Sequence, residues 1–302
     1  MGYRDYSTAK GHIVDATGHG DFTTITAAIT AAVSGQTVFI RPGTYPEDPP
    51  LKAAVNLAAF DCDWLGQVNI LGKCTFTGTG TVSLSGIQFT TNSDFALAVT
   101  GSNASVIELI NCSTSSANNT AISFTSSNSS AAIVFRDCKL DTSTTGVAHF
   151  SKSSPGVLSF ISCSAGNTGA STTANTNSAG GVSFTNCFFG LGLNNSSSSL
   201  DSSIFNSIYD NSPNNQTMVT TSGTGFITIV ASYFASGTAS AISIGAGTTI
   251  GLANSTVNSS NTNAITGTGT LDAGIVTFTG TSSTINGTLT VNKYTTFGGT
   301  IV

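Results

Sequence analysis

The chain has 302 residues, of which only 8% are charged, and its formal net charge is −5. The nine basic residues are spread thinly, and this argues against nucleic acid as a partner, because phosphate binding needs a basic patch. No run of 18 apolar residues occurs, which excludes a membrane-spanning helix.

Residues 1–13, MGYRDYSTAKGHI, form the first predicted segment. The segment has no apolar core long enough for a signal peptide, so we expect synthesis in the cytosol. Tyrosine and arginine are favoured at interfaces, and we therefore expect this segment to attach the chain to another protein. The predicted attachment residues are Tyr3, Arg4, Tyr6 and Lys10.

Residues 14–60 predict an N-terminal cap with one helix and the first strands. In DFTTITAAITAAVSGQ (21–36) apolar residues recur on one helical face, Asp21 or Thr23 can cap the start and Gly35 can end the helix. That face consists of Ile25, Ala28, Ile29, Ala32 and Val33. Just after the cap, Trp64 in DCDWLG is a candidate for stacking on a sugar ring, although a packing role is the more common one.

A repeat of about 24 residues runs through residues 61–287. Each unit alternates apolar and other residues, slips by one position and alternates again, which indicates two strands joined by a sharp bend. The residues at the slip are Gly86, Asn111, Asp137, Ser162, Asn186, Asn206, Ala231 and Asn254. The inward position that follows each slip holds Ile87, Cys112, Cys138, Cys163, Cys187, Ser207, Ser232 and Ser255. Asn, Asp and Gly tolerate the left-handed backbone that such a bend needs.

The repeat predicts an all-β fold, a single-stranded parallel β-helix of about nine coils. A third short strand precedes several units, at 95–99, 121–124, 146–150, 241–244 and 264–266. No helical period follows residue 36, which argues against a helical solenoid. Stacked coils place equivalent residues about 4.8 Å apart, so the cysteines are predicted to form a buried column and the bend amides to bond from coil to coil.

The residues that could carry chemistry are few. Stacked parallel thiols do not suit a disulfide, and Cys-x-x-Cys spacing is absent, so no metal site or cofactor is predicted; Cys62 and Cys74 lie outside the column. A glycan-cleaving role for RDCKLD (136–141) would need two carboxyls about 5 to 9.5 Å apart across a groove. We expect a structural role, because Asp137 belongs to the bends. His12, His19 and His149 are isolated, and His149 is predicted to point outward, so no catalytic residue is predicted.

Residues 288–302, TLTVNKYTTFGGTIV, read as strand without a covering helix. An open stack of strands needs a cover at its end. We therefore expect sister copies of the chain to cover this end, most simply in a homotrimer.

The segment VDATGHGDFTTITAAITAAVSGQTVFIRPGTYPED (14–48) resembles the N-terminal cap of the pectin lyase-like right-handed parallel β-helix superfamily. That superfamily includes pectin esterases, polysaccharide lyases, and the tail spikes and tail fibres of bacteriophages. The resemblance implies a right-handed helix with a short capping α-helix. Similarity to the esterases ends at GTYPE, whereas low charge and richness in Ser, Thr, Asn and Gly are shared with phage appendages.

These observations lead us to expect a non-enzymatic structural or adhesive virion protein of a bacteriophage, in a tail fibre, a tail spike or a capsid-surface decoration. The expected partners are sister copies and other virion proteins, with host-surface glycan as a further candidate. The alternative is a polysaccharide depolymerase, a lyase or hydrolase acting on bacterial surface glycan. A bacterial adhesin is a third possibility, which the missing export signal disfavours.

Overall fold

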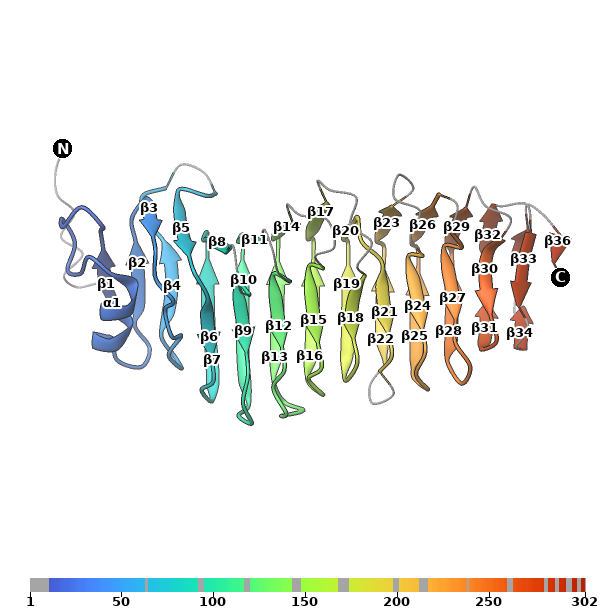
Figure 1. The fold of residues 1–302 in the computed structure, drawn as a ribbon, viewed down its shortest axis with the longest axis horizontal. Coiled ribbons are helices and arrows are strands. Elements are labelled where there is room, and N and C mark those ends of the chain that lie inside the picture. Colours follow the sequence, from blue (N-terminus) through green and yellow to red (C-terminus); the bar gives the residue numbers. More distant parts are fainter. Residues whose placement is uncertain are drawn as a thin grey trace.

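The computed structural model describes residues 11–62, 65–91, 95–116, 120–142, 148–167, 174–197, 201–211, 217–237, 239–259, 263–279, 282–285, 288–291, 295–297 and 300–301. The chain winds into a rod whose coils stack in sequence order, with the two termini at opposite ends (Figure 1). Strands of neighbouring coils pair in parallel. This is the predicted parallel β-helix, built from three long sheets.

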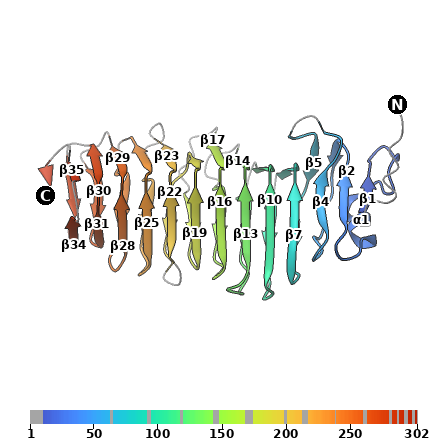
Figure 2. The ribbon, with the colours of Figure 1, turned by 180° about the vertical axis from the view of Figure 1, so that it is seen from behind.

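Sheet A runs the length of the rod, and most of its strands are labelled along the rod in Figure 2. Within the described residues it has 13 strands: β1 (Gly11–Val14), β2 (Thr37–Ile40), β4 (Asn56–Ala59), β7 (Gly80–Ser85), β10 (Ser105–Ile110), β13 (Ala132–Arg136), β16 (Val157–Ile161), β19 (Gly181–Thr185), β22 (Ser202–Phe205), β25 (Phe226–Val230), β28 (Thr249–Ala253), β31 (Thr270–Ala273) and β34 (Thr288–Val291).

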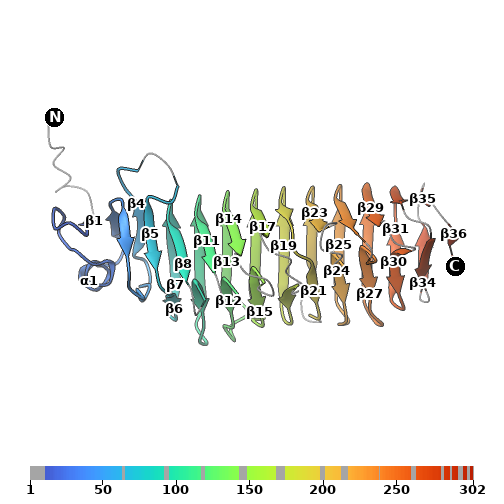
Figure 3. The same ribbon diagram turned by 45° about the horizontal axis from the view of Figure 1, so that its top comes forward.

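Sheet B lies along the upper edge of Figure 1 and comes forward in Figure 3. The described chain gives it 12 strands: β3 (Gly43–Tyr45), β5 (Val68–Leu71), β8 (Gln88–Thr91), β11 (Ser113–Ser116), β14 (Lys139–Thr142), β17 (Ser164–Asn167), β20 (Phe188–Phe189), β23 (Ile208–Asn211), β26 (Tyr233–Ser236), β29 (Ser255–Ser259), β32 (Val276–Thr279) and β35 (Thr295–Phe297).

Sheet C closes each coil and has the shortest strands in most of them. Counting described residues only, it has 11 strands: β6 (Cys74–Phe76), β9 (Leu97–Val99), β12 (Ile122–Phe124), β15 (Phe150–Lys152), β18 (Asn175–Asn177), β21 (Leu193–Asn195), β24 (Val219–Thr221), β27 (Ile242–Ile244), β30 (Asn263–Gly267), β33 (Ser282–Ile285) and β36 (Thr300–Ile301).

The interior is a continuous column of apolar side chains. Strand alternation sends every second residue inward, and pairing in register stacks it on its counterpart in the next coil. Phe160, for example, stacks between Phe135 and Phe184 with ring centroids 5.0 and 5.1 Å away. The eight predicted inward positions, from Ile87 to Ser255, are all between 0% and 4% exposed. The predicted ladder is therefore confirmed.

In the eight coils from Gly86 to Asn254, the bend between sheets A and B contains a left-handed residue. All eight predicted bend residues have φ between 46° and 69°. Residues other than Gly, Asn and Asp adopt this region at a cost of roughly 1–2 kcal/mol. The Asn, Asp and Gly residues at the slip thus set the corner of the coil, as predicted.

Ala231 provides the clearest test of the bend, because it is exposed and has φ 52° without a side-chain amide. We expect Ala231→Gly to raise the free energy of unfolding by about 1 kcal/mol, since glycine adopts this φ without strain. Urea unfolding followed by circular dichroism measures the change. The matched control is Ala253→Gly in strand β28, which should lower stability by about 0.5–1 kcal/mol. Equal effects of the two substitutions would contradict the assignment.

The helix of the cap is shorter than predicted. Helix α1 spans Ile25–Ala31, and Ala32 already has extended backbone. Ile25, Ala28, Ile29 and Ala32 are buried as expected, but Val33 is 62% exposed because it lies beyond the last helical turn. Among the described residues no helix has the length and apolar character needed to cross a membrane.

The start of α1 is capped differently from the prediction. Thr24, and neither Asp21 nor Thr23, is the N-cap, and its hydroxyl accepts from the amide of Ala27. The Asp21 carboxylate instead accepts from the Ile13 amide at 2.8 Å. The free amides of Ile25 and Thr26 donate to the Glu47 carboxylate at 2.7 and 2.8 Å. The sequence did not indicate this contact, because Glu47 lies more than 20 residues after the start of the helix.

Candidate functional site

An open groove follows the bend between sheets A and B in the middle of the rod. We call it the bend groove, and its volume is about 720 Å3. Its lining consists of Ser162, Cys163, Ser164, Asn186, Cys187, Phe188, Asn206, Ser207, Ile208, Ala231, Ser232, Tyr233, Asn254 and Thr256. Each of the first four coils along the groove contributes its bend residue, the inward residue that follows, and the first outward residue of sheet B, and the fifth contributes Asn254 and Thr256. The same kinds of group therefore recur from coil to coil along the axis.

The outward residues of sheet B form an apolar row in the groove. Strand register places Phe188 beside Ile208, and Ile208 beside Tyr233. Thr256 continues the row in the next coil. Phe188 and Ile208 are each 45% exposed, which is high for large apolar side chains. Two aromatic side chains and an aliphatic side chain thus lie in line across three coils.

The bend residues supply polar groups beside this row. The Asn206 Nδ2 donates to Asn186 Oδ1 at 2.8 Å, which is the predicted amide ladder. Asn254 holds the same position two coils further on, after Ala231. Each carboxamide offers two N–H donors and a carbonyl acceptor, so the exposed rungs keep hydrogen-bonding capacity for a ligand.

The floor of the groove is structural. The Ser207 hydroxyl donates to the Phe205 carbonyl at 2.8 Å and accepts from the Cys187 amide at 3.1 Å. The pKa of the Cys187 thiol is raised, mainly by its hydrogen bond with the Cys163 thiol and to a smaller extent by burial. A buried neutral thiol is a poor nucleophile. Within the described residues no group of three or more His, Cys, Asp or Glu side chains has the arrangement of a metal site.

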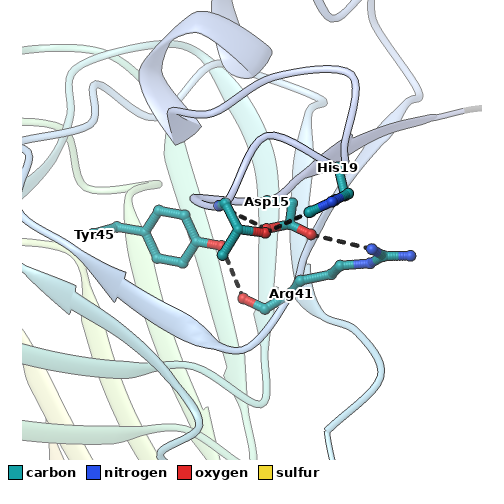
Figure 4. Close-up of polar contacts among 5 residues, drawn as sticks. Asp15, His19, Arg41 and Tyr45 are labelled. Atoms are coloured by element: carbon teal, nitrogen blue, oxygen red, sulfur yellow. Dashed lines mark hydrogen bonds and ion pairs between the residues drawn. The ribbon is translucent and has the colours of Figure 1, made fainter.

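A second polar cluster lies in the N-terminal cap (Figure 4). Asp15 accepts from the amide and hydroxyl of Thr17 at 2.8 and 2.6 Å, and from Arg41 at 3.1 Å. Thr17 also contacts His19 at 2.9 Å, and Tyr45 donates to the Arg41 carbonyl. The hydrogen bonds from Thr17, with a smaller contribution from Arg41, lower the pKa of Asp15 to about 2. A carboxylate that stays ionised cannot act as a general acid near neutral pH, so we assign the cluster to cap stability.

The charged RDCKLD segment has the structural arrangement that we expected. Arg136 pairs with Glu108 of the preceding coil at 2.7 Å, and Lys139 pairs with Asp141 at 2.8 Å. Asp137 is the bend residue, with φ 54°. The first ion pair joins two neighbouring coils, and the second joins two residues of strand β14. The two pairs do not form a common site.

The predicted binding residues Tyr3, Arg4, Tyr6, Lys10 and Trp64 lie outside the described residues. Their roles stay predictions. The residues that line the bend groove were not predicted as a site. The sequence does contain a signal for this site: a large apolar residue directly follows the inward position in three successive repeats. These residues are Phe188, Ile208 and Tyr233.

His149 does not point outward, and that prediction was wrong. The side chain is 0% exposed, its Nε2 lies 3.0 Å from the Gly166 carbonyl, and its ring meets Phe189 edge to face. The amides of His149 and Phe150 both donate to Asn175 Oδ1, so the chain turns into sheet C with two consecutive side chains inside. The strand is therefore Phe150–Lys152 and not 146–150. Burial lowers the pKa of His149 to about 4, and the ring is neutral.

Comparison with known proteins gives structural likeness only. No known family matches the chain, and no curated protein is detectably similar in sequence. Among solved structures, a pectin methylesterase from Aspergillus niger is 15% identical with a TM-score of 0.48, over 68% of this chain and 87% of that one. Carrot pectin methylesterase is 13% identical with a TM-score of 0.44, over 89% and 82%. The A-module of a mannuronan C-5 epimerase from Azotobacter vinelandii is 11% identical with a TM-score of 0.36, over 92% and 93%.

These solved structures carry the names of enzymes, and this contradicts our prediction that the chain is not an enzyme. The inference from phage-like composition and from the lack of paired catalytic carboxylates was wrong, because neither feature separates binding proteins from enzymes within one fold. At 11–15% identity the likeness shows the fold alone. The chain shares the right-handed parallel β-helix fold with these proteins.

Proposed function

We propose that the chain binds a linear glycan along the bend groove. The observation that carries the proposal is the row of Phe188, Ile208 and Tyr233 beside the amide ladder of Asn186 and Asn206. Sugar rings have apolar C–H faces and hydroxyl-bearing edges. Aromatic and aliphatic side chains cover the faces, and carboxamides hydrogen-bond the edges.

The periodicity of the groove supports a polymer as the ligand. Neighbouring coils lie about 4.8 Å apart, so equivalent groups recur at the strand spacing along the rod. A chain of sugars lying parallel to the axis meets the same kinds of contact in successive coils. Weak contacts made several times by one linked ligand add up to useful avidity.

The setting that we propose is the surface of a phage-like virion, where such a rod would attach to bacterial surface glycan. The low charge and the Ser-, Thr-, Asn- and Gly-rich composition support this setting. We propose sister copies in a homotrimer, other virion proteins and host-surface glycan as the partners. Residues 1–13 remain the proposed attachment segment.

The test is binding of the protein to a panel of immobilised bacterial surface polysaccharides. We expect Phe188→Ala and Tyr233→Ala each to weaken binding roughly 5- to 30-fold, because each removes an apolar face worth about 1–2 kcal/mol. Val157→Ala is the matched control, since Val157 is 40% exposed on sheet A but lies outside the groove. Its binding should equal that of the wild type.

Release of new reducing or unsaturated ends from the bound polysaccharide is measured in the same samples. Cleavage would identify the chain as a depolymerase, and its absence would leave binding as the activity. Failure of the whole panel to bind, or equal binding by the groove variants and the wild type, would overturn the proposal.

A further inference from the structure

None of the described residues that line the bend groove carries a charged side chain. The fourteen lining residues are hydroxyl, amide, thiol, aliphatic and aromatic groups. We infer that the groove selects a neutral glycan over a polymer of uronic acids, an inference that rests on the proposed glycan-binding function. It goes beyond that function because it assigns a chemical class to the ligand.

Lys152 is the cation nearest to the groove in sequence, but it is buried. The exposed cations next nearest in sequence among the described residues are already paired. Arg136 and Lys139 belong to the coil before Ser162, and each forms an ion pair, with Glu108 and Asp141 respectively. Each pair therefore adds a carboxylate beside its cation. The surface next to the groove thus offers little net positive charge.

A further charge close to the groove is negative. Asp210 lies two residues after Ile208 in strand β23, so alternation places both side chains on the outer face of sheet B. With a net charge of −5 for the whole chain, the local field repels an anionic polymer.

The energetics favour hydroxyls over carboxylates at such a site. A carboxylate that leaves water needs several charge-assisted hydrogen bonds, and a cation to balance its charge, to recover its hydration energy. Carboxamides can donate to a carboxylate, but neither they nor the aromatic row supply a cation. A sugar hydroxyl, by contrast, both donates to and accepts from a carboxamide, and its ring faces lose little on contact with Phe188 and Tyr233.

The experiment compares polymers that differ only in the carboxylate. The fixed pair is polygalacturonate and the galactan made from it by carboxyl reduction. The second pair is the polysaccharide that binds best in the panel and its opposite form, made by oxidising primary alcohols to carboxylates or by reducing carboxylates. We expect the neutral member of the second pair to bind at least 10-fold more tightly. Its affinity should change less than twofold between 50 and 500 mM NaCl, because no ion pair is involved.

A gain-of-function variant tests the same point in the opposite direction. Thr256 lies in the row next to Tyr233 and carries no charge. Thr256→Lys should raise affinity for the carboxylated member about 5- to 10-fold at 50 mM NaCl, and the gain should disappear at 500 mM. Thr256→Gln, of similar length and without charge, is the control and should show no gain.

The outcomes separate this inference from the proposed function. Tighter binding of the carboxylated member by the wild type would overturn the neutral-glycan inference and leave glycan binding in place. Binding of no polysaccharide in the panel and neither member of the fixed pair would overturn both.

Discussion

Lys152→Met should make the protein more stable at pH 7 and less stable at pH 10. Lys152 is 1% exposed, and its Nζ donates to the carbonyls of Ser154, at 2.6 Å, and Ala179. The ammonium also lies 5.6 Å from the centre of the Phe124 ring. A buried cation held only by dipoles and a ring is costly.

The expected crossover follows from the pKa of this lysine. Burial lowers the pKa of Lys152 from 10.5 to about 7. Between pH 7 and pH 10.5 the unfolded chain holds a proton on Lys152 that the folded chain has released. The free energy of unfolding of the wild type therefore rises with pH over this range. At about 1.4 kcal/mol per pKa unit, the advantage of the Met variant should fall by about 4 kcal/mol from pH 7 to pH 10. At pH 10 the two carbonyls left without a donor should make the variant the less stable protein, by about 1–2 kcal/mol.

Urea unfolding of both proteins at several pH values measures this difference directly. Subtracting the free energy of unfolding of the wild type from that of the variant cancels the contributions of the other lysines, tyrosines and thiols, which titrate in both proteins. Lys139→Met is the control, because Lys139 is 59% exposed and pairs with Asp141 on the surface. A difference for Lys152→Met that stays constant from pH 7 to pH 10 would show that the lysine is charged throughout.

The bends and the inward ladder were predictable from sequence because both depend on local rules. A left-handed corner favours Asn, Asp or Gly, and an inward column favours apolar or small residues. Each therefore appears in the sequence as a residue type that recurs at a fixed position of the repeat. Asn206 and Cys187 are examples of positions whose conformation and burial follow from the repeat alone.

The entry into sheet C was not predictable by the same rules. At Ala96 and Leu97, two consecutive amides donate to one carbonyl, that of Ala121, and both side chains face inward. Simple alternation fails at such a point, and this is why His149 was placed on the wrong side. The register of the third strand depends on contacts with the next coil, which the sequence does not show.

The bend groove could have been found in part. Phe188, Ile208 and Tyr233 share one column of the repeat, and an apolar column at an outward position is unusual for an exposed strand face. The volume of the groove depends on how the side chains of four or five coils pack beside the bends. That packing can be described only from the three-dimensional structure.

Phe160→Ala should destabilise the protein by about 3–5 kcal/mol and divide the rod at its centre. Phe160 is 0% exposed and contacts four rings, those of Phe135, Phe150, Phe184 and Phe189, with centroids 5.0–5.4 Å away. The substitution removes the largest side chain from one coil and leaves a cavity between its two neighbours. In a stacked repeat each coil is stabilised mainly by the next one, so a loss at one interface uncouples the two sides.

Urea unfolding should accordingly change from one transition to two, and limited proteolysis should produce two fragments of about half the length of the chain. Phe160→Leu fills most of the same space and should cost only about 1–2 kcal/mol while keeping a single transition. Val157→Ala, on the outer face of the same strand, should change stability by less than about 0.5 kcal/mol. If Phe160→Ala lowered stability and left one sharp transition, the rod would be folding as a single cooperative unit, with coupling that reaches well beyond the neighbouring coil.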